Sequence, residues 1–274
     1  MPAIDLSEKP IAITGAGSGI GRATAIACAK AGMPVALAGR REDMLIDAKS
    51  EIERIGSRAI AVTTDVTSQP DCDALIERTC EVFGSIYAVY GNAGYGFEKP
   101  MHETTDAELR AIFETNFFGC MNIIRPALPR MIHAGQGHVL LCSSCIGKIG
   151  MPLYGPYCAT KGAQVLIARA MRHELKPLGV HVTSVHPVLT STEFAQVAQR
   201  VTGANRMADD MPKFLVQSPE RVARATLDAL RWPRTEVWTS HTTRWLFALL
   251  NAMPRVADLA LNRFTNKSAP TDQE

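Results

Sequence analysis

The stretch Pro10-Ile-Ala-Ile-Thr-Gly-Ala-Gly-Ser-Gly-Ile-Gly21 decides the fold of this chain. Its apolar start predicts a short strand, its glycines predict a turn, and the helix formers from Arg22 to Ala31 predict a helix directly after it. Glycines let a backbone approach a phosphate closely, and the first turn of a helix offers unpaired N–H groups and the positive end of its dipole. The stretch therefore predicts a nucleotide-phosphate site at the end of a first strand.

Strand and helix patterns alternate through the rest of the chain. Apolar runs predict further strands at residues 34–38, 58–63, 86–90, 138–142, 180–186 and 235–239. Helical patterns cover residues 42–55, a segment opened by 68–70, residues 104–133 with an interruption at 116–119, residues 157–177 and residues 218–230. This alternation predicts an α/β fold, a single doubly wound parallel sheet flanked by helices, with a ligand across the carboxyl ends of the strands.

The composition excludes several kinds of protein and site. The N-terminal segment lacks the basic start and apolar run of a signal peptide, and no run reaches the roughly 20 apolar residues that span a bilayer, so we expect a cytoplasmic protein. Seven cysteines, an odd number, predict reduced thiols and no disulfide framework. His181 and His186 face opposite sides of a predicted strand, so we expect no metal site there.

A second stretch, residues 143–161, carries the residues for chemistry. Tyr157 and Lys161 are spaced so that they share one face of a predicted helix, where the ammonium favours the charged form of the phenol. A free tyrosine titrates near pH ~10, and a nearby positive charge lowers that pKa toward working pH, where the phenol both gives and takes a proton. Ser144 lies earlier, at the end of a predicted strand, where its hydroxyl can meet the same substrate oxygen.

These two stretches resemble the short-chain dehydrogenase/reductase family. The glycines follow the pattern Thr14-Gly-x-x-x-Gly-Ile-Gly21, which differs from the ordinary fingerprint G-x-G-x-x-G, and the second stretch has the family's Ser and Tyr-x-x-x-Lys. The resemblance covers residues 10–240 and implies a Rossmann-like fold and an oxidoreductase with a nicotinamide cofactor. Two positions depart from the family: Gly91 replaces the first Asn of Asn-Asn-Ala-Gly, and Val188 replaces a Gly after proline. Since a β-branched residue does not readily take positive φ, we expect the loop at Val188 to run differently or not to need that conformation.

The resemblance also implies the roles of site residues. Tyr157 is the general acid and base, and Ser144 orients and polarises the substrate oxygen. Lys161 lowers the pKa of Tyr157 and bonds the nicotinamide ribose, and Asn116 holds a water that links Lys161 to solvent. A buried structural amide is the alternative for Asn116, and a turn aspartate is the alternative for Asp65. The implied cofactor contacts come from the ends of the strands: Gly15, Ser18, Gly19, Ile20, Gly21, Arg40, Arg41, Asp65, Val66, Asn92, Ala93, Gly94, Tyr157, Lys161, Pro187 and Thr192.

The choice of cofactor depends on the end of the second predicted strand. Units that prefer NAD carry an acidic residue there for the ribose hydroxyls, whereas an arginine accommodates a 2′-phosphate. This chain has Arg40 and Arg41 and lacks the acid, so we expect NADP(H), with NAD(H) as the alternative and Arg40 as the better candidate for the phosphate contact. Two solvated charges at the start of the next helix are the other interpretation of this pair.

The substrate is predicted from the side chains around the second stretch. Most of them are apolar: Tyr95, Phe97, Ile146, Ile149, Met151, Leu153 and Tyr154. The segment 188–217, where the family carries its substrate lid, adds Phe194, Met207, Met211 and Phe214. A hydrophobic carbonyl compound or alcohol suits such a pocket. The alternative is an NADP-binding sensor or scaffold without turnover; such relatives typically lose the tyrosine or the lysine, which this chain keeps.

The chain is expected to end in a helical tail, residues 241–274, after the catalytic domain of residues 1–240. Two apolar stretches in the tail, residues 245–250 and 256–261, are split by Pro254 and accompanied by arginines. We expect these stretches to cover the pocket or a neighbouring subunit. Contact with a membrane surface is the less favoured alternative.

The expected partners are small molecules and like subunits. With 29 basic and 27 acidic side chains, the charge balance gives no footprint for nucleic acid and no strong field for acidic partners. The resemblance implies a homodimer or homotetramer. Its contacts would run through the helices at residues 104–133 and 157–177.

Overall fold

The structure is a computed structural model, and it describes residues 2–191 and 216–266. Within these ranges, one sheet has the strand order β3-β2-β1-β4-β5-β6-β7, and every neighbouring pair is parallel. The strands are β1 (Ile11–Thr14), β2 (Val35–Gly39), β3 (Ala59–Thr63), β4 (Ala88–Gly91), β5 (Gly137–Cys142), β6 (Val180–His186) and β7 (Glu236–Trp238). This sheet confirms the predicted Rossmann-like, doubly wound parallel architecture.

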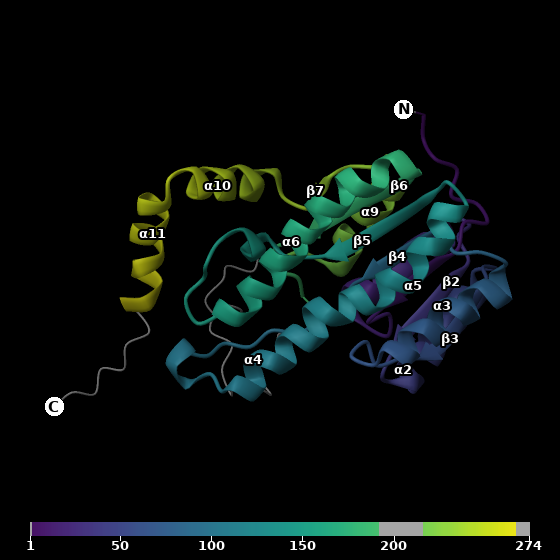
Figure 1. The fold of residues 1–274 in the computed structure, drawn as a ribbon, viewed down its shortest axis with the longest axis horizontal. Coiled ribbons are helices and arrows are strands. Elements are labelled where there is room, and N and C mark those ends of the chain that lie inside the picture. Colours follow the sequence, from purple (N-terminus) through teal and green to yellow (C-terminus); the bar gives the residue numbers. More distant parts are fainter. Residues whose placement is uncertain (1, 192–215, 267–274) are drawn as a thin grey trace.

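Helices connect the parallel strands (Figure 1). The α-helices are α1 (Gly19–Lys30), α2 (Glu42–Arg54), α3 (Gln69–Phe83), α4 (Asp106–Phe113), α5 (Gly119–His133), α6 (Gly155–Leu175), α9 (Pro219–Arg231), α10 (His241–Ala252) and α11 (Pro254–Asn266). Short 3-10 turns are η1 (Met101–Glu103), η3 (Cys145–Lys148) and η4 (Lys176–Leu178). The interruption predicted at residues 116–119 is a π-helical turn, η2 (Glu114–Phe118), which joins α4 to α5 without ending the helix.

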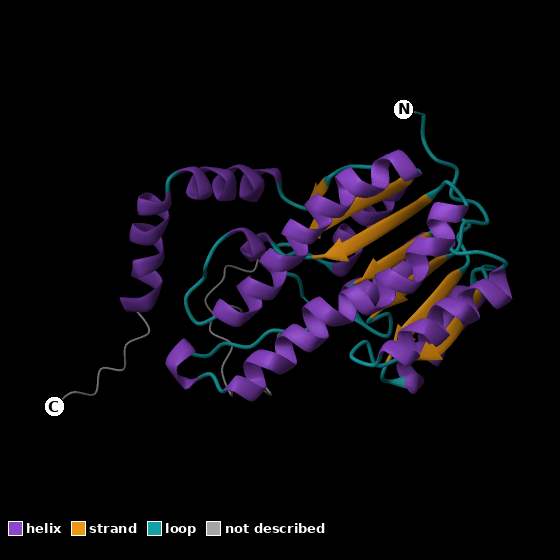
Figure 2. Ribbon diagram, viewed as in Figure 1, coloured by secondary structure: helices purple, strands orange, loops and turns teal. Residues whose placement is uncertain are grey.

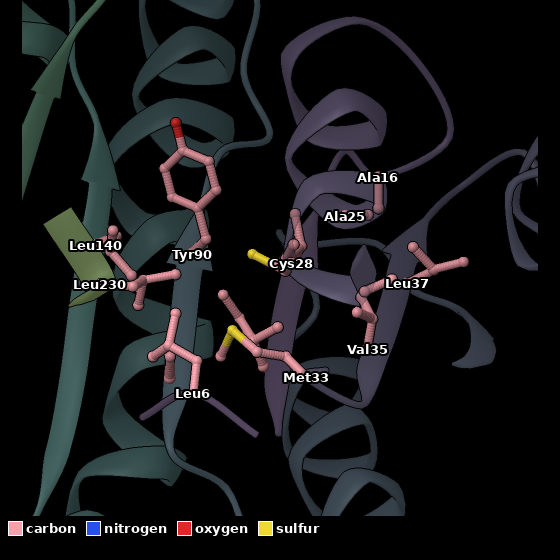
Figure 3. Close-up of a cluster of buried hydrophobic side chains, with 14 of the residues drawn as sticks. Leu6, Ala16, Ala25, Cys28, Met33, Val35, Leu37, Tyr90, Leu140 and Leu230 are labelled. Carbon is pink, nitrogen blue, oxygen red and sulfur yellow. The ribbon is translucent and has the colours of Figure 1, made fainter. Parts of the chain in front are cut away.

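Side chains from the two faces of the sheet enter two apolar clusters. In β1, Ile11 and Ile13 point to one face and Ala12 points to the other, since successive side chains alternate along a strand. The first cluster packs under α1, α2 and α9, and the second packs under α3, α5 and α6, so helices cover both faces (Figure 2). Figure 3 shows part of the first cluster, where Tyr90 of β4 and Cys28 of α1 meet. Burial on both faces explains why the strands are continuous apolar runs in the sequence.

The carboxyl ends of the strands gather the loops that carry the motif residues. β1 lies between β2 and β4, so the connections turn to opposite sides of β1. In open α/β sheets, ligands bind at such a switch point, outside the carboxyl ends of the strands. The segments that leave the sheet at this edge after β1, β4, β5 and β6 are residues 15–18, 92–100, 143–154 and 187–191.

The tail helices α10 and α11 extend away from the sheet and its helices (Figure 1). α10 has no buried side chain, and it contacts the apolar cluster around Tyr157 through Phe247. Trp245, Leu246 and Leu249 are each more than half exposed. The tail therefore packs against the predicted pocket through Phe247, while much of the apolar surface of α10 faces solvent. In the described ranges, no helix combines the length and the apolar character that crossing a membrane requires.

The predicted lid, residues 188–217, is described at its two ends. These ends meet in a short parallel bridge between Thr190 and Gln217. Residues 192–215 lie outside the described residues, and with them Thr192 and the four apolar side chains that the sequence places in the lid.

Candidate functional site

The glycine turn after β1 has no space for side chains at its two end positions. A Cβ added at Gly21 would lie 2.2 Å from the carbonyl oxygen of Gly15, and one added at Gly15 would lie 2.9 Å from Nδ2 of Asn92. Gly15 also has a φ of 65°, in the left-handed region that favours glycine. Ser18 precedes the first residue of α1, and its side chain makes no capping hydrogen bond. The first N–H groups of α1 are therefore directed at a turn in which the glycines leave no room for further side chains.

A hydrogen-bonded brace joins the ends of β1 and β4 beside this turn. The hydroxyl oxygen of Thr14 accepts hydrogen bonds from the backbone N–H groups of Asn92 and Ala93, each at 3.0 Å. The side-chain amide of Asn92 donates to the carbonyl of Thr14 at 2.9 Å. Asn92 therefore braces the ends of the two strands. The sequence analysis did not single out Thr14, although it starts the glycine pattern.

Both arginines lie at the carboxyl end of β2, close to the glycine turn. Nη2 of Arg41 donates a hydrogen bond to Oγ of Ser18 at 3.1 Å. Burial raises the pKa of Tyr95, and the positive charge of Arg40 opposes that rise. Glu42 and Asp43 form the first turn of α2, where negative charges favour the helix dipole.

Asp65, after β3, makes local hydrogen bonds, whereas Val66 packs against the start of α5. The carboxylate of Asp65 accepts hydrogen bonds from the backbone N–H of Thr67 at 2.9 Å and from its hydroxyl at 2.8 Å. Val66 is buried against Gly119, where an added Cβ would lie 2.6 Å from the valine side chain. The turn-aspartate alternative therefore describes the contacts of Asp65, and an adenine contact stays a prediction.

Ser144, Tyr157 and Lys161 come together at the carboxyl end of β5. Ser144 precedes η3, Tyr157 and Lys161 lie near the start of α6, and none of the three side chains is more than 9% exposed. Nζ of Lys161 lies 5.6 Å from the centre of the Tyr157 ring. Burial raises the pKa of Tyr157 well above its ordinary value, although a hydrogen bond with Ser144 opposes the rise. The spacing prediction placed the ammonium near the ring, but the expected lowering of the Tyr157 pKa is wrong for this structure, because burial raises that pKa.

The ammonium of Lys161 is held by two acceptors. Nζ donates to the carbonyl of Cys142 at 2.7 Å and to Oε1 of Gln164 at 3.3 Å. Burial lowers the pKa of Lys161. Gly94 leaves open the space beside the Lys161 ammonium. A Cβ added at Gly94 would lie 3.5 Å from Nζ of Lys161 and 2.8 Å from Oδ1 of Asn116.

Asn116, in the π-helical turn η2, is fully buried and its polar atoms have protein partners. Its Oδ1 accepts from the N–H of Tyr95 at 2.9 Å, and its Nδ2 donates to the Tyr95 carbonyl at 2.8 Å. Nδ2 also donates to Oγ1 of Thr160 at 3.1 Å. The backbone carbonyl of Asn116 accepts from Nε2 of Gln164 at 2.6 Å. These contacts match the alternative of a buried structural amide; the water predicted at Asn116 stays a prediction.

The two departures from the family pattern have physical explanations. A Cβ added at Gly91 would lie 2.3 Å from the sulfur of Cys120, so the thiol occupies the place of a side chain. Val188 does not take positive φ, and its side chain packs against the cluster around Tyr157. The loop therefore does not need a glycine here, as the sequence analysis allowed. Pro187 anchors this loop, because its carbonyl accepts from the N–H of Cys145 at 3.0 Å.

An apolar cluster surrounds Tyr157, as predicted for the substrate pocket. Of the predicted lining residues, Phe97, Ile146 and Tyr154 are buried in this cluster. Others pack at its edge: Tyr95, Met151 and Leu153. Ile149 is half-buried outside it.

One acidic residue near this cluster was missed from the sequence. Glu98 is buried, and its Oε2 accepts a hydrogen bond from the phenol of Tyr154 at 3.0 Å. The two segments are also joined by the N–H of Lys99, which donates to the carbonyl of Leu153 at 2.8 Å. Leu153 has a φ of 66°, a left-handed conformation that is uncommon for leucine. No sequence pattern marked Glu98 as buried, since a lone acidic residue is usually exposed.

Comparisons with known proteins agree with this geometry. A family model for short chain dehydrogenases matches residues 9–201. The chain is 29% identical over 261 residues to the ketoacyl reductase HetN of Nostoc sp.. The aligned region covers 94% of this chain and 88% of HetN. A short chain dehydrogenase/reductase from Burkholderia phymatum, solved in complex with NAD, matches with a TM-score of 0.83 and 27% identity over 99% of both chains. A 3-ketoacyl-(acyl-carrier-protein) reductase from Brucella melitensis, complexed with NADH, matches with a TM-score of 0.76 and 26% identity over 85% of this chain and 96% of that one.

The matched region contains both stretches on which the site is built. It begins before the glycine turn and continues past Lys161. It covers well over half of the chain, and the Burkholderia phymatum structure matches over nearly all of it. The chain belongs to the short-chain dehydrogenase/reductase family.

Proposed function

We propose that this chain transfers a hydride between NADP(H) and the carbonyl or secondary alcohol of a hydrophobic small molecule, with Tyr157 as the general acid and base. One observation carries the proposal: a hydroxyl, a phenol and an ammonium, from Ser144, Tyr157 and Lys161, meet in a buried apolar setting at the carboxyl end of the sheet. Membership of an oxidoreductase family supports an enzyme acting on such groups.

The backbone at the switch point fits a dinucleotide. Glycines at positions 15, 21 and 94 keep open a cradle that added Cβ atoms would fill, and the N-terminus of α1 faces that cradle. When bound there, a nicotinamide cofactor supplies or accepts the hydride. NAD and NADH are bound by the two similar structures, whereas Arg40 and Arg41 of this chain support a 2′-phosphate. The remaining proposed contacts are Ser18, Gly19, Ile20, Asp65, Val66, Asn92, Ala93, Tyr157, Lys161, Pro187 and Thr192.

The chain's own residues then move the proton. In reduction, the phenol of Tyr157 gives its proton to the carbonyl oxygen, and the raised pKa of Tyr157 keeps that phenol protonated beforehand. The hydroxyl of Ser144 donates a hydrogen bond to the same oxygen as negative charge develops on it. The ammonium of Lys161 stabilises the phenolate that remains and bonds the nicotinamide ribose. The apolar cluster around Tyr157 excludes water and favours an apolar substrate.

The domain organisation and the assembly are also proposals. We infer a catalytic unit of residues 1–240, with its lid at 188–217, followed by the tail of residues 241–274. A cytoplasmic homodimer or homotetramer would use the outer surfaces of α5 and α6. Phe118, beside α5, and Leu166, on α6, support such contacts because their apolar side chains are 47% and 69% exposed.

The test is consumption of NADPH with a panel of apolar ketones, aldehydes and quinones, beside NADH and beside Tyr157→Phe. We expect turnover that prefers NADPH, and a loss of about 10²–10⁴-fold in kcat in the variant, the usual contribution of general acid–base catalysis. The Kd of the cofactor should change less than twofold, as measured by fluorescence titration.

The matched control is Tyr87→Phe, which removes a phenol that is also buried but lies at the opposite end of β4. It should keep the wild-type rate. A Tyr157→Phe protein that retains most of its activity would contradict the assignment. Tight NADPH binding by a wild-type protein that turns over no member of the panel would favour the sensor alternative.

A further inference from the structure

Gln164 forms a polar link between two of the predicted catalytic residues. Its side chain is fully buried, one turn after Lys161 on α6. Its Nε2 donates to the backbone carbonyl of Asn116 at 2.6 Å, and its Oε1 accepts from Nζ of Lys161 at 3.3 Å. One amide thus connects the ammonium on α6 to the π-helical turn η2.

These two partners determine which way the amide points. The carbonyl of Asn116 can only accept a hydrogen bond, and the ammonium of Lys161 can only donate. Rotation of the Gln164 amide by half a turn would set two acceptors against each other and two donors against each other. A neutral amide therefore matches this position in one orientation, with Oε1 toward the ammonium. Leucine would satisfy neither partner, and a carboxylate would satisfy only one.

The surroundings of Lys161 increase the importance of this acceptor. The titratable groups that face Nζ are Cys142 from β5, Cys120 from α5 and Tyr157 from α6. Burial raises the pKa of each of these three groups, so they are uncharged at neutral pH. Burial also lowers the pKa of Lys161 itself. Neutral acceptors, the Cys142 carbonyl and Oε1 of Gln164, therefore hold the buried ammonium.

We propose that Gln164 is the positioning residue of Lys161, and that its amide takes the place of the water by which, as the family resemblance implies, Asn116 links Lys161 to solvent. This inference rests on the proposed function, in which Lys161 stabilises the phenolate of Tyr157. An amide at neutral pH neither gives nor takes a proton. The link therefore fixes the place and the charge of the ammonium, and it does not conduct protons to solvent.

The test compares Gln164→Met, Gln164→Glu and a control. Methionine has a similar volume and removes both hydrogen bonds, whereas glutamate keeps an acceptor and adds a negative charge. The control is Gln69→Met on α3, which removes an amide that bonds Asp73 at 2.8 Å and the carbonyl of Asn122 at 3.2 Å, away from the site. Its loss of Tm measures what a purely structural amide contributes.

The first readout needs no substrate. Lysine labelled with ¹³C at Cε gives an NMR signal for Lys161, which Lys161→Arg assigns, and its pKa follows from a pH titration. We expect Gln164→Met to lower that pKa by about one unit, because a hydrogen bond to a charged group is lost, and Gln164→Glu to raise it. Gln69→Met should leave it unchanged. Shifts of opposite sign distinguish an effect on charge from a general loss of packing.

The second readout is turnover. In Gln164→Met we expect kcat to fall about tenfold with the KM of the carbonyl substrate within twofold, and the alkaline limb of the kcat profile to move down with the lysine pKa. An unchanged Lys161 titration in Gln164→Met, with a Tm loss equal to that of Gln69→Met, would overturn the proposal. If Gln164→Met does not fold, an unchanged titration in Gln164→Glu overturns it instead. Absence of turnover in the wild-type protein would count against the proposed function alone, since the titration still decides the role of Gln164.

Discussion

The two halves of the candidate site are built by opposite means. The half around the glycine turn, residues 14–21 with 92–94, obtains its shape from closely packed backbone at the glycines, where side chains are missing, and from the brace between Thr14 and Asn92. The half around residues 142–164 obtains its shape from polar side chains that are buried and paired. We therefore expect added atoms to disturb the first half most strongly, and the loss of polar atoms to disturb the second half most strongly. Substitutions in the two halves should have different signatures.

Ser144→Ala sharpens the comparison most strongly, because it removes a single hydroxyl from the second half. We expect kcat to fall by about 10²–10³-fold, the usual cost of losing a hydrogen-bond donor to a developing oxyanion. The Kd of NADPH should stay within twofold, measured by fluorescence titration. Ser143→Ala is the neighbouring comparison, since it removes a buried hydroxyl that donates to the backbone carbonyl of Lys161 at 2.9 Å but is not proposed to bond the substrate; kcat should fall less than in Ser144→Ala. A large loss of cofactor affinity in Ser144→Ala would break the division between the halves.

Gly21→Ala tests the first half by adding one methyl group. The new Cβ would lie 2.2 Å from the carbonyl oxygen of Gly15, so the turn must shift. We expect the Kd of NADPH to rise at least about tenfold and the free energy of unfolding to fall by about 1–3 kcal/mol. Calorimetric titration and urea unfolding measure these two quantities. Gly155→Ala, where an added Cβ meets open space, should change neither, and a Gly21→Ala protein with normal affinity would contradict the backbone cradle.

Arg40→Ala and Arg41→Ala test whether the two arginines beside the first half bind the 2′-phosphate of NADPH. A guanidinium that pairs with the 2′-phosphate distinguishes NADPH from NADH, so its loss should lower the ratio of the two kcat/KM values by about tenfold. Arg54→Ala, at the exposed end of α2, should leave the ratio unchanged. If neither arginine variant alters the ratio, the 2′-phosphate contact is wrong and NAD(H) becomes the favoured cofactor.

The smallest expected effect is a pH dependence of stability near the second half. Burial lowers the pKa of His186, at the end of β6 beside the second half, to about 4, and that of His138, at the opposite end of the sheet, to about 3; both titrate near 6.5 when unfolded. A depressed folded pKa stabilises the protein above pH 6.5, and this stability is lost as the pH falls toward 4. We expect each histidine to contribute a loss of about 2 kcal/mol between pH 7.5 and 4.5.

Urea unfolding at several pH values checks this expectation. His186→Phe keeps a ring against Trp238, which stacks on His186 at 4.7 Å, and it should flatten the fall. His133→Gln, at an exposed position, should not. An equally steep fall in His186→Phe would show that other groups cause the acid sensitivity.

The same contrast explains what was predictable from the sequence. The glycine turn, the alternation of strands and helices, and the Tyr157–Lys161 pair were predicted because each depends on residues that are close in the chain. Contacts between distant segments were missed: Gln164 meets Asn116 across 48 residues, and Glu98 meets Tyr154 across 56. The direction of the Tyr157 pKa was missed for a related reason. Helical spacing brings an ammonium near, but it does not reveal how deeply the tertiary fold buries the phenol.

The contact between Gly91 and Cys120 makes two positions depend on each other. While the thiol keeps its place, any side chain at position 91 meets its sulfur, at 2.3 Å from the Cβ. We therefore expect an asparagine at position 91, as in the family pattern, to displace the Cys120 thiol. Gly91→Asn alone should lower the free energy of unfolding, and Cys120→Ala in the same chain should relieve part of that loss, because the sulfur is gone. Substitutions at these two positions are thus expected to be coupled through a single sulfur atom.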